Sequence, residues 1–404
     1  MRELIFICHC VPYPADKGEK IRALNILQHL SQSFRIHLGC LITGPDDQAS
    51  LEPLRQWCAS IGAFRIDKRR QKWKALLKAR PGRPLMTEYY YTPPLQDWVA
   101  SRMAAVEMDI VYIYSVAMMP YVQQLRRPGM ILDAVDIDSE KWTTYAATTR
   151  PPMKWVWARE GRTLLAYERQ SAARCDATLF VSPQEAARFQ QLAPDVAGRV
   201  HAVQNGVDLE RFHPALAMPS PYGPAEGPRL VFAGHMDYWP NADAVEWFVA
   251  EVLPPLRAAH PGLTLHVVGA NPGPAVMRLA ASPGVTVTGR VPDVRPYVLH
   301  ADVSVAPLRI ARGIQNKVLE AMAMGRPVIA SPQAFEGLQA QPGRDLLVAD
   351  GTEAFAAAVT AVLRGAHPGL GAAGRRVVET GYAWPATLSP LDTILAASLG
   401  AAVA

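Results

Sequence analysis

The sequence has 404 residues, of which half are hydrophobic and 19% are charged, and its formal net charge is +5. This composition is typical of a soluble globular protein and excludes a disordered chain; no apolar run reaches the roughly 18 residues of a membrane-spanning helix. Because the length exceeds one ordinary hydrophobic core, we expect two domains.

The N-terminal half opens with an apolar run at residues 4–10. Prolines follow this run and no small-residue cleavage site does, so it is predicted to be a buried strand rather than a signal peptide. Further strands are predicted at residues 35–41, 109–114, 130–133 and 177–181, and helices at residues 18–31 and 163–173.

Five cysteines are spread unevenly through the chain, and two of them flank His9. Cys8-His9-Cys10 suggests a metal site, but alternate residues of a strand point to opposite sides, and no second Cys/His pair lies at zinc-site spacing. We therefore expect buried thiols, no bound metal and a reducing, cytoplasmic compartment.

The positive charge belongs to the first half, where residues 1–205 hold 27 Lys/Arg against 20 Asp/Glu. Nine of these basic residues lie in the segment from Arg65 to Arg83, together with Trp73, Leu76 and Leu77. The pattern predicts a basic amphipathic helix that rests on an anionic membrane surface, which would place the protein on the inner face of the cytoplasmic membrane. The alternatives are a solvated basic face or a nucleic-acid patch; the lack of further aromatic residues among the basic ones disfavours nucleic acid.

The C-terminal half alternates regularly between strand and helix patterns. Strands are predicted at residues 229–234, 263–269, 285–289, 302–308, 327–331 and 345–348, with helices at 241–259 and 275–281. Short apolar strands separated by helices indicate a parallel sheet covered on both faces, so the fold class is α/β with two doubly wound, Rossmann-like domains. Neither half has a Gly-x-Gly-x-x-Gly after its first strand, which disfavours a nicotinamide oxidoreductase.

A boundary between the halves is predicted near residues 205–227. Asn205-Gly206 is a strong turn signal, and a Pro/Gly-rich stretch follows it. The expected organisation is a first domain at 1–205, a second at 206–384 and a last helix at 385–404 that packs back across the hinge.

The segment from Gly313 to Ser331 carries the most chemical information. A helix beginning near Asn316 offers unpaired backbone N–H groups and a partial positive charge, which suit a diphosphate. Gly313 permits a close backbone approach, and Arg309, Arg312 and Lys317 add positive charge. Lys317 and Glu320 share one helical face, so that one can meet a phosphate and the other sugar hydroxyls. The alternative is an exposed ion pair beside an ordinary helix.

Two groups of residues in the first half suit an acceptor. Gly18, Lys20 and Arg22 open the first helix and could bind a phosphate of donor or acceptor, or form a plain basic helix cap. Asp136 and Asp138 follow a buried strand, where carboxylates are costly unless they are used or solvated. They are predicted to contact an acceptor hydroxyl; the alternative is helix capping by Asp138 or Ser139.

Several motifs together carry a family resemblance. They are the run from Lys317 to Ile329, Asn205-Gly206-Val207-Asp208 with Phe212 and Pro214, Phe232-Ala-Gly234, Gly289-Arg-Val-x-Asp293 and Ala301-Asp302-Val-Ser-Val-x-Pro307. In this order they resemble family 4 glycosyltransferases of the GT-B fold, known as glycosyl transferases group 1. Pro14 to Arg22, Asp136 to Trp142 and His235 to Asn241 further resemble the subgroup associated with exosortase (PEP-CTERM) and exopolysaccharide gene clusters.

The resemblance implies an acceptor-binding first domain and a donor-binding second domain facing a cleft. It implies retaining transfer of a sugar from a nucleotide-diphosphate sugar to a lipid-linked saccharide acceptor, with no metal and no cofactor. The predicted catalytic residues are Asp136, Asp138 and Lys317, with Lys317 clamping the leaving diphosphate. The predicted donor-binding residues are Gly234, Asn241, Arg290, Arg309, Arg312, Gly313, Asn316, Lys317 and Glu320.

The sequence departs from the family pattern in the donor motif. The family commonly has two glutamates eight apart, and Arg312 stands where the first would fall. Only the ribose contact therefore transfers, to Glu320. The family's usual Arg and Lys after Gly234 are also absent, so Arg290, Arg309, Arg312 or Lys317 is expected to supply the phosphate charge. The alternative functions are a GT-B nucleotide-sugar epimerase and a non-catalytic nucleotide-sugar-binding component of a polysaccharide assembly complex.

Overall fold

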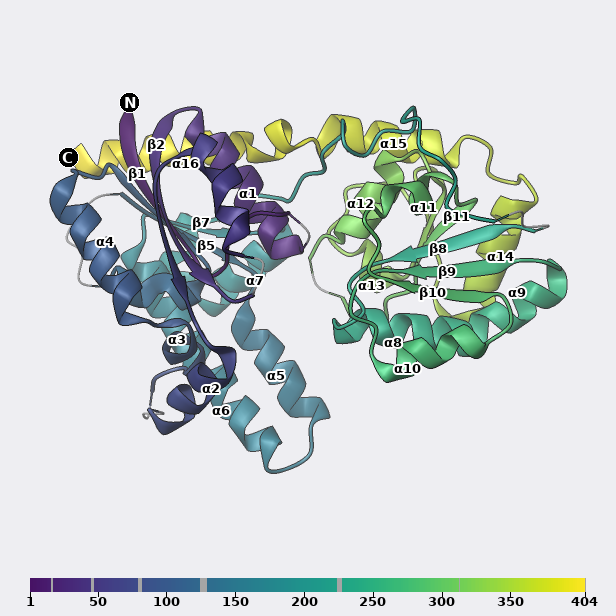
Figure 1. Cartoon of the computed structure of the whole chain (residues 1–404), viewed down its shortest axis with the longest axis horizontal. Coiled ribbons are helices and arrows are strands. Elements are labelled where there is room, and N and C mark those ends of the chain that lie inside the picture. The colour runs from purple at the N-terminus through teal and green to yellow at the C-terminus, as the bar shows by residue number, and fades with distance from the viewer. Residues whose placement is uncertain are drawn as a thin grey trace. The chain divides into compact units, whose positions relative to one another are not determined.

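A computed structural model describes residues 1–15, 17–44, 47–78, 82–123, 129–223, 227–311 and 313–403 (Figure 1). The chain divides into two compact units. The N-terminal unit comprises Met1–Gln204 and Leu388–Ala404, and the C-terminal unit comprises Asn205–Thr387. Each unit is built around one parallel sheet.

The sheet of the N-terminal unit has seven strands in the order β3-β2-β1-β4-β5-β6-β7. Leu4 to Cys8 of β1 are completely buried, because helices cover both faces of the sheet. The strands are β1 (Arg2–Cys8), β2 (Phe34–Ile42), β3 (Cys58–Arg65), β4 (Ile110–Tyr114), β5 (Gly129–Val135), β6 (Ala177–Phe180) and β7 (Val200–Ala202).

The helices of this unit are α1 (Gly18–Ser31), α2 (Lys68–Leu77), α3 (Leu85–Tyr90), α4 (Pro93–Ala105), α5 (Asp138–Thr148), α6 (Met153–Arg174) and α7 (Pro183–Leu192). The last helix, α16 (Trp384–Val403), packs on them with its later turns. There His29 Nε2 of α1 lies 2.7 Å from Asp392 Oδ1, and a Cβ on Gly129 would lie 3.2 Å from the Ser398 carbonyl oxygen.

The sheet of the C-terminal unit has six strands in the order β10-β9-β8-β11-β12-β13. They are β8 (Arg229–Ala233), β9 (Thr264–Val268), β10 (Val285–Gly289), β11 (Val303–Ala306), β12 (Val328–Ala330) and β13 (Leu347–Val348). Its helices are α8 (Trp239–Trp247), α9 (Leu253–Ala259), α10 (Pro274–Arg278), α11 (Arg295–Leu299), α12 (Asn316–Ala323), α13 (Pro332–Phe335), α14 (Gly351–Leu363) and α15 (Leu370–Gly381).

The structure confirms the predicted α/β class with two parallel, Rossmann-like sheets, and it differs from the sequence-based elements in several places. The helix predicted at 241–259 is two helices, α8 and α9, joined by a π-helical turn at Phe248–Val252. The turn precedes Pro254 and Pro255, which lack the N–H groups that a continuous helix needs. Strands β3 and β7 were not predicted, because β3 has a weakly apolar sequence and β7 has only three residues. Helix α6 begins ten residues before the predicted position.

The strand order of each sheet predicts where a ligand binds. In the first sheet the order reverses between β1 and β4, and in the second it reverses between β8 and β11. In open α/β sheets, ligands bind outside the carboxyl ends of the strands at such a switch point. The residues after β1 and β4, and those after β8 and β11, are therefore where a ligand is expected.

Candidate functional site

In the C-terminal unit, the end of β8 and the first turn of α12 meet at Lys317. Its ammonium donates a hydrogen bond to Asn241 Oδ1 and lies 4.5 Å from the centroid of the Phe232 ring. Asn241 is buried and donates from Nδ2 to the His235 carbonyl oxygen at 2.8 Å. A Cβ on Gly234 would lie 2.8 Å from Asn241 Nδ2 and 3.3 Å from Lys317 Nζ. The strand-end glycine therefore leaves the space that this lysine occupies.

The charges of Lys317 and Glu320 are perturbed in opposite directions. Burial lowers the pKa of Lys317 to about 7, although the nearby Glu320 raises it. Burial raises the pKa of Glu320 to about 7, against the opposite effects of Arg211 and Lys317. Burial makes the charged form of each side chain unfavourable unless an opposite charge lies nearby. An anionic ligand would therefore stabilise the Lys317 ammonium. Titratable groups perturbed in this way are typical of functional sites.

Asn316, the first residue of α12, has an unused acceptor. Among the described residues, its buried Oδ1 has no hydrogen-bond partner. An orphaned buried acceptor costs free energy, and a hydroxyl or N–H donor of a ligand would remove that cost. Gly313 precedes the helix with φ of 64°, a left-handed conformation that glycine adopts without strain. Both residues thus lie where the sequence placed the donor.

The predicted arginines are distributed differently from the lysine. Arg309 is half-exposed and forms an ion pair with Asp243, with Nε donating to Oδ2 at 2.9 Å. Arg290 is exposed in the turn after β10. Arg312 lies outside the described residues. Lys317 is the only lysine in residues 206–404. The positive charge that is predicted to bind the phosphate is therefore carried by Lys317 and these arginines.

The sequence did not predict a role for Arg211 or Phe232 at this site. Arg211 is close enough to lower the pKa of Glu320, and the Phe232 ring packs under the Lys317 ammonium. Both residues stand in motifs that carried the family resemblance. Their side-chain contacts depend on how β8, α12 and the segment after Asn205 come together, which no local pattern encodes.

In the N-terminal unit, Arg22 has a structural partner. Its guanidinium is completely buried and donates to both carboxylate oxygens of Asp133 at 3.0 to 3.2 Å, and to the Val203 carbonyl oxygen at 2.7 Å. Tyr112 Oη donates to the same carboxylate at 2.8 Å. Arg22 therefore holds α1 to the sheet, and its guanidinium does not reach open space for an acceptor phosphate.

Lys20 and Gly18 occupy the start of α1. Lys20 Nζ donates to Asp47 Oδ1 at 3.2 Å, and Asp47 also accepts from the Thr43 and Gly44 backbone N–H groups. The Lys20 ammonium is therefore already neutralised by one carboxylate. Gly18 is the first residue of the helix and is exposed.

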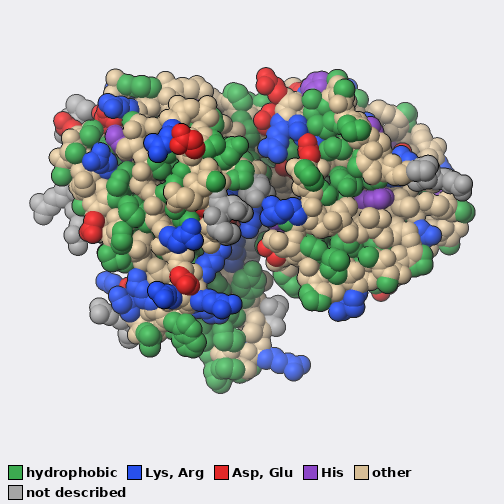
Figure 2. All heavy atoms as spheres, viewed as in Figure 1, with side chains coloured by type: hydrophobic (Ala, Val, Ile, Leu, Met, Phe, Trp, Pro, Cys, Tyr) green, Lys and Arg blue, Asp and Glu red, His purple; other side chains and the backbone are tan. Residues whose placement is uncertain are grey.

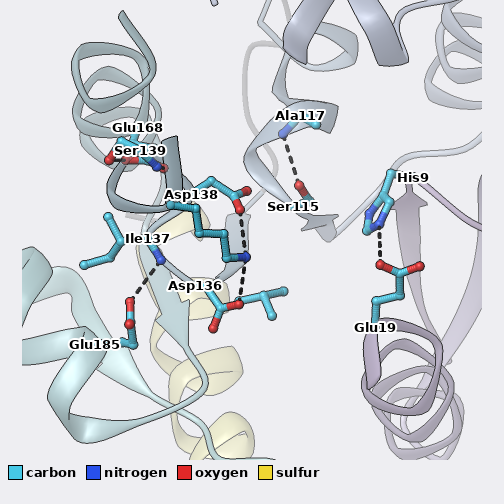
Figure 3. A network of polar contacts seen from close by, with 12 residues as sticks. His9, Glu19, Ser115, Ala117, Asp136, Ile137, Asp138, Ser139, Glu168 and Glu185 are labelled. Atoms are coloured by element: carbon cyan, nitrogen blue, oxygen red, sulfur yellow. Dashed lines mark hydrogen bonds and ion pairs between the residues drawn. The ribbon is translucent and has the colours of Figure 1, made fainter. Parts of the chain in front are cut away.

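Asp136 and Asp138, both labelled in Figure 3, share one cation, Lys141. Lys141 Nζ donates to Asp136 Oδ2 and to Asp138 Oδ1, both at 3.0 Å. Burial lowers the pKa of Lys141, but the two carboxylates outweigh it and raise the pKa well above its ordinary value. The structure thus brings the two predicted aspartates together and adds a lysine that the sequence did not single out.

The first turn of α5 is satisfied by carboxylates of other helices rather than by Asp138 or Ser139. Glu185 accepts from the Ile137 N–H at 3.0 Å, and Glu168 accepts from the Ser139 N–H at 3.0 Å and from its hydroxyl at 2.6 Å (Figure 3). Burial raises the pKa of Glu168 to about 8 in spite of these hydrogen bonds. The side-chain capping alternative is therefore not what the structure contains.

His9 and Glu19 form a further pair at the end of β1, which the sequence did not single out as such. His9 Nε2 lies 3.7 Å from Glu19 Oε2, and the ring stacks on Tyr114 with centroids 5.8 Å apart. Burial lowers the pKa of His9, but Cys10 and Glu19 raise it more strongly, to about 9. The close approach of the His9 imidazole lowers the pKa of Glu19 to about 2.

Backbone strain marks the neighbouring strand ends. Ser115, after β4, has φ of 78°, and Val135, the last residue of β5, has φ of 70°. Non-glycine residues adopt this region at a cost of roughly 1–3 kcal/mol and do so most often at functional sites. The carboxyl edge of this sheet therefore combines strain, a His–Glu pair and a carboxylate cluster.

Comparison with solved structures identifies the fold. Sucrose-phosphate synthase from Thermosynechococcus elongatus is similar with a TM-score of 0.73 at 19% identity, covering 99% of this chain and 100% of that one. HepE of Anabaena, in complex with UDP and glucose, has a TM-score of 0.69 at 15% identity, covering 98% and 100%. WaaG, a glycosyltransferase involved in lipopolysaccharide biosynthesis, has a TM-score of 0.64 at 15% identity, covering 96% and 99%. The fold is that of the GT-B glycosyltransferases.

Comparison with protein families identifies the domain in the C-terminal unit. Residues 227–365, within the C-terminal unit, match the family Glycosyl transferases group 1. The C-terminal unit thus contains a glycosyl transferases group 1 domain, and this supports a glycosyltransferase as the class of enzyme. Comparison of the sequence with curated proteins gives no significant match. Within the described part of the chain, no helix is long and apolar enough to cross a membrane.

Proposed function

We propose that the protein is a retaining glycosyltransferase that moves a sugar from a nucleotide-diphosphate sugar to a hydroxyl of a saccharide acceptor. The observation that carries this proposal is Lys317, held by Asn241 and the Phe232 ring beside the strand-end Gly234. A lysine with a depressed pKa, at the first turn of a helix and at the carboxyl edge of a parallel sheet, suits a diphosphate.

In the proposed reaction, the bond between the anomeric carbon and the diphosphate oxygen breaks as the acceptor oxygen bonds to the same face of that carbon. The acceptor proton passes to the leaving diphosphate. Negative charge grows on the diphosphate, and Lys317, which a bound phosphate would keep protonated, stabilises it. Glu320 and the unused Oδ1 of Asn316 accept hydrogen bonds from hydroxyl or N–H groups of the nucleotide.

We further propose a uridine nucleotide as the donor, since structures of HepE contain UDP and UDP-glucose. On the acceptor side we propose Asp136 and Asp138 as contacts of the sugar hydroxyl, with Lys141 bridging the two carboxylates. The role of Gly18 and Lys20 near an acceptor phosphate is part of the same proposal.

For the acceptor we propose a lipid-linked saccharide in exopolysaccharide synthesis, met at an anionic membrane surface in the cytoplasm. Helix α2 supports this, because Trp73 and Leu77 are 69% and 85% exposed among basic residues. Figure 2 shows Lys and Arg side chains gathered beside hydrophobic ones over this part of the N-terminal unit. Exposed aromatic and basic residues on one helix are typical of interfacial binding. The motifs that resemble the exosortase-associated subgroup support the pathway.

The test is a thermal-shift panel of nucleoside diphosphates, followed by product assays with the stabilising nucleotide's sugars. We expect UDP to stabilise the protein, and UDP to be released only when a saccharide acceptor is present. Interconversion of the donor sugar without acceptor would instead establish an epimerase. Binding without any turnover across donors and acceptors would establish a non-catalytic component.

A further inference from the structure

The chain bends immediately after β1 and brings three metal-binding side chains together. Strand β1 ends at Cys8, so the alternation of side chains along a strand does not extend to His9 and Cys10. Ligand atoms of Cys8, His9 and Cys10 all lie within 4.8 Å of one another. Among the described residues this is the one such group of three. Strand geometry therefore does not hold the side chains of His9 and Cys10 on opposite sides of the chain.

The two sulfurs have the spacing of a shared metal ion. Cys8 Sγ and Cys10 Sγ are 3.7 Å apart. A tetrahedral zinc ion with Zn–S bonds of about 2.3 Å separates two thiolate sulfurs by about 3.8 Å. Both thiols are buried, with 0% and 4% exposure. They are thus already positioned at the required separation without rearrangement of the backbone.

The orientation of the His9 ring supports a metal site independently of the two sulfurs. Its Nδ1 is buried and, within the described part of the chain, has no hydrogen-bond partner. Its Nε2 faces the Glu19 carboxylate at 3.7 Å. Histidines that bind metals commonly direct the other ring nitrogen to a carboxylate, which fixes the ring and its tautomer. Tyr114 and Tyr90 hold the ring by a stacked and an edge contact, at 5.8 and 5.5 Å between centroids.

We propose that Cys8 Sγ, Cys10 Sγ and His9 Nδ1 bind a zinc ion, with Glu19 as the positioning residue behind His9. Binding would release the two thiol protons, and the proton on Nδ1, to solvent. The His9 side chain is 15% exposed, so the fourth coordination position is open to water. The site lies at the end of β1 in the N-terminal unit, whereas α12 belongs to the C-terminal unit.

Cobalt(II) titration of the whole, chelator-treated and reduced protein tests this site. We expect one equivalent of cobalt to bind with intense near-ultraviolet absorption from thiolate ligands, and zinc to displace it. Cys8→Ser and Cys10→Ser should each weaken zinc binding at least tenfold, whereas Cys175→Ser, at another buried thiol, should leave it unchanged. Glu19→Gln should weaken zinc binding roughly 10- to 100-fold and retain the thiolate absorption.

X-ray absorption of the zinc-loaded wild-type protein needs no variant and covers the case in which a cysteine variant fails to fold. We expect two sulfur neighbours at about 2.3 Å and one imidazole nitrogen. A shell of oxygen and nitrogen alone, or cobalt absorption that persists in the Cys8→Ser/Cys10→Ser double variant, overturns the proposal. Since the nucleotide thermal shift is measured separately, failure of the zinc site leaves the transferase proposal standing.

Discussion

The Lys317 ammonium donates a hydrogen bond to Asn241 Oδ1, across 76 residues of sequence. This contact joins the first turn of α12 to the first turn of α8 and places the lysine beside the end of β8. The lysine is thereby held ready for a ligand before the ligand arrives, which lowers the cost of organising the site.

Removal of the Lys317 ammonium tests its role directly. If this ammonium stabilises the leaving diphosphate, Lys317→Ala should lower kcat/KM by about 10²- to 10³-fold, or roughly 3–4 kcal/mol. Steady-state kinetics and UDP titration measure the effect. Arg278→Ala, which removes an exposed cation of the same unit, serves as the matched control. Unchanged turnover and UDP affinity in Lys317→Ala would rule the role out.

Gly234→Ala should disturb the same site sterically. The added Cβ would lie 2.8 Å from Asn241 Nδ2, closer than real contacts allow, and would push Asn241 and Lys317 away. We expect at least a tenfold loss of nucleotide affinity by calorimetry with a small change in Tm. Gly273→Ala is the control, because its Cβ would meet no atom within 4 Å. Equal affinities in the two variants would contradict the close packing of this site.

Glu168 should make stability depend on pH. Burial raises its pKa to about 8 in the folded state, above the ordinary value of 4.5, so the folded protein holds this proton more tightly than the unfolded chain. Stability is therefore full below about pH 4.5 and declines as pH rises to about 8. Glu168→Gln, which keeps partners for the Ser139 N–H and hydroxyl, should lose this decline and gain on the order of a few kcal/mol at pH 9. Urea unfolding at pH 6 and pH 9 measures it; parallel pH profiles would contradict the assignment.

Arg22 should contribute to stability rather than to ligand binding. Arg22→Ala leaves the buried Asp133 carboxylate without its cation, which costs about 3–5 kcal/mol. Replacing both partners, in Arg22→Met/Asp133→Leu, should cost clearly less than Arg22→Ala. Denaturant unfolding gives the two values, and Arg35→Ala, at an exposed arginine, is the control. An Arg22→Ala protein of wild-type stability with weakened acceptor binding would restore the original prediction for this residue.

Helix α2 should carry the proposed membrane contact. Trp73→Ser/Leu77→Ser removes its most exposed apolar side chains, and should abolish most co-sedimentation with vesicles containing anionic lipid. Binding of the wild-type protein should fall as salt rises, because the basic residues are screened. Trp239→Ser, at an exposed tryptophan of the other unit, is the control. Wild-type binding that is equal for neutral and anionic vesicles, or absent, would exclude the electrostatic contact.

The amino-acid sequence by itself determined the α/β class, most of the strands and the helix that begins at Asn316. Hydrophobic runs such as residues 303–306 and 328–330, each flanked by a proline, indicate buried parallel strands by local pattern alone. The helix that carries Lys317 and Glu320 was predicted because a helix start after a strand is also a local signal.

Only the tertiary structure decided which side chains meet. Arg22 pairs with Asp133 across 111 residues, and Lys141 lies between Asp136 and Asp138. The bend that turns His9 toward Cys8 and Cys10 likewise follows from where β1 ends within its sheet. These contacts depend on strand order and on the packing of distant helices, and the periodicity of any one segment carries no information about either.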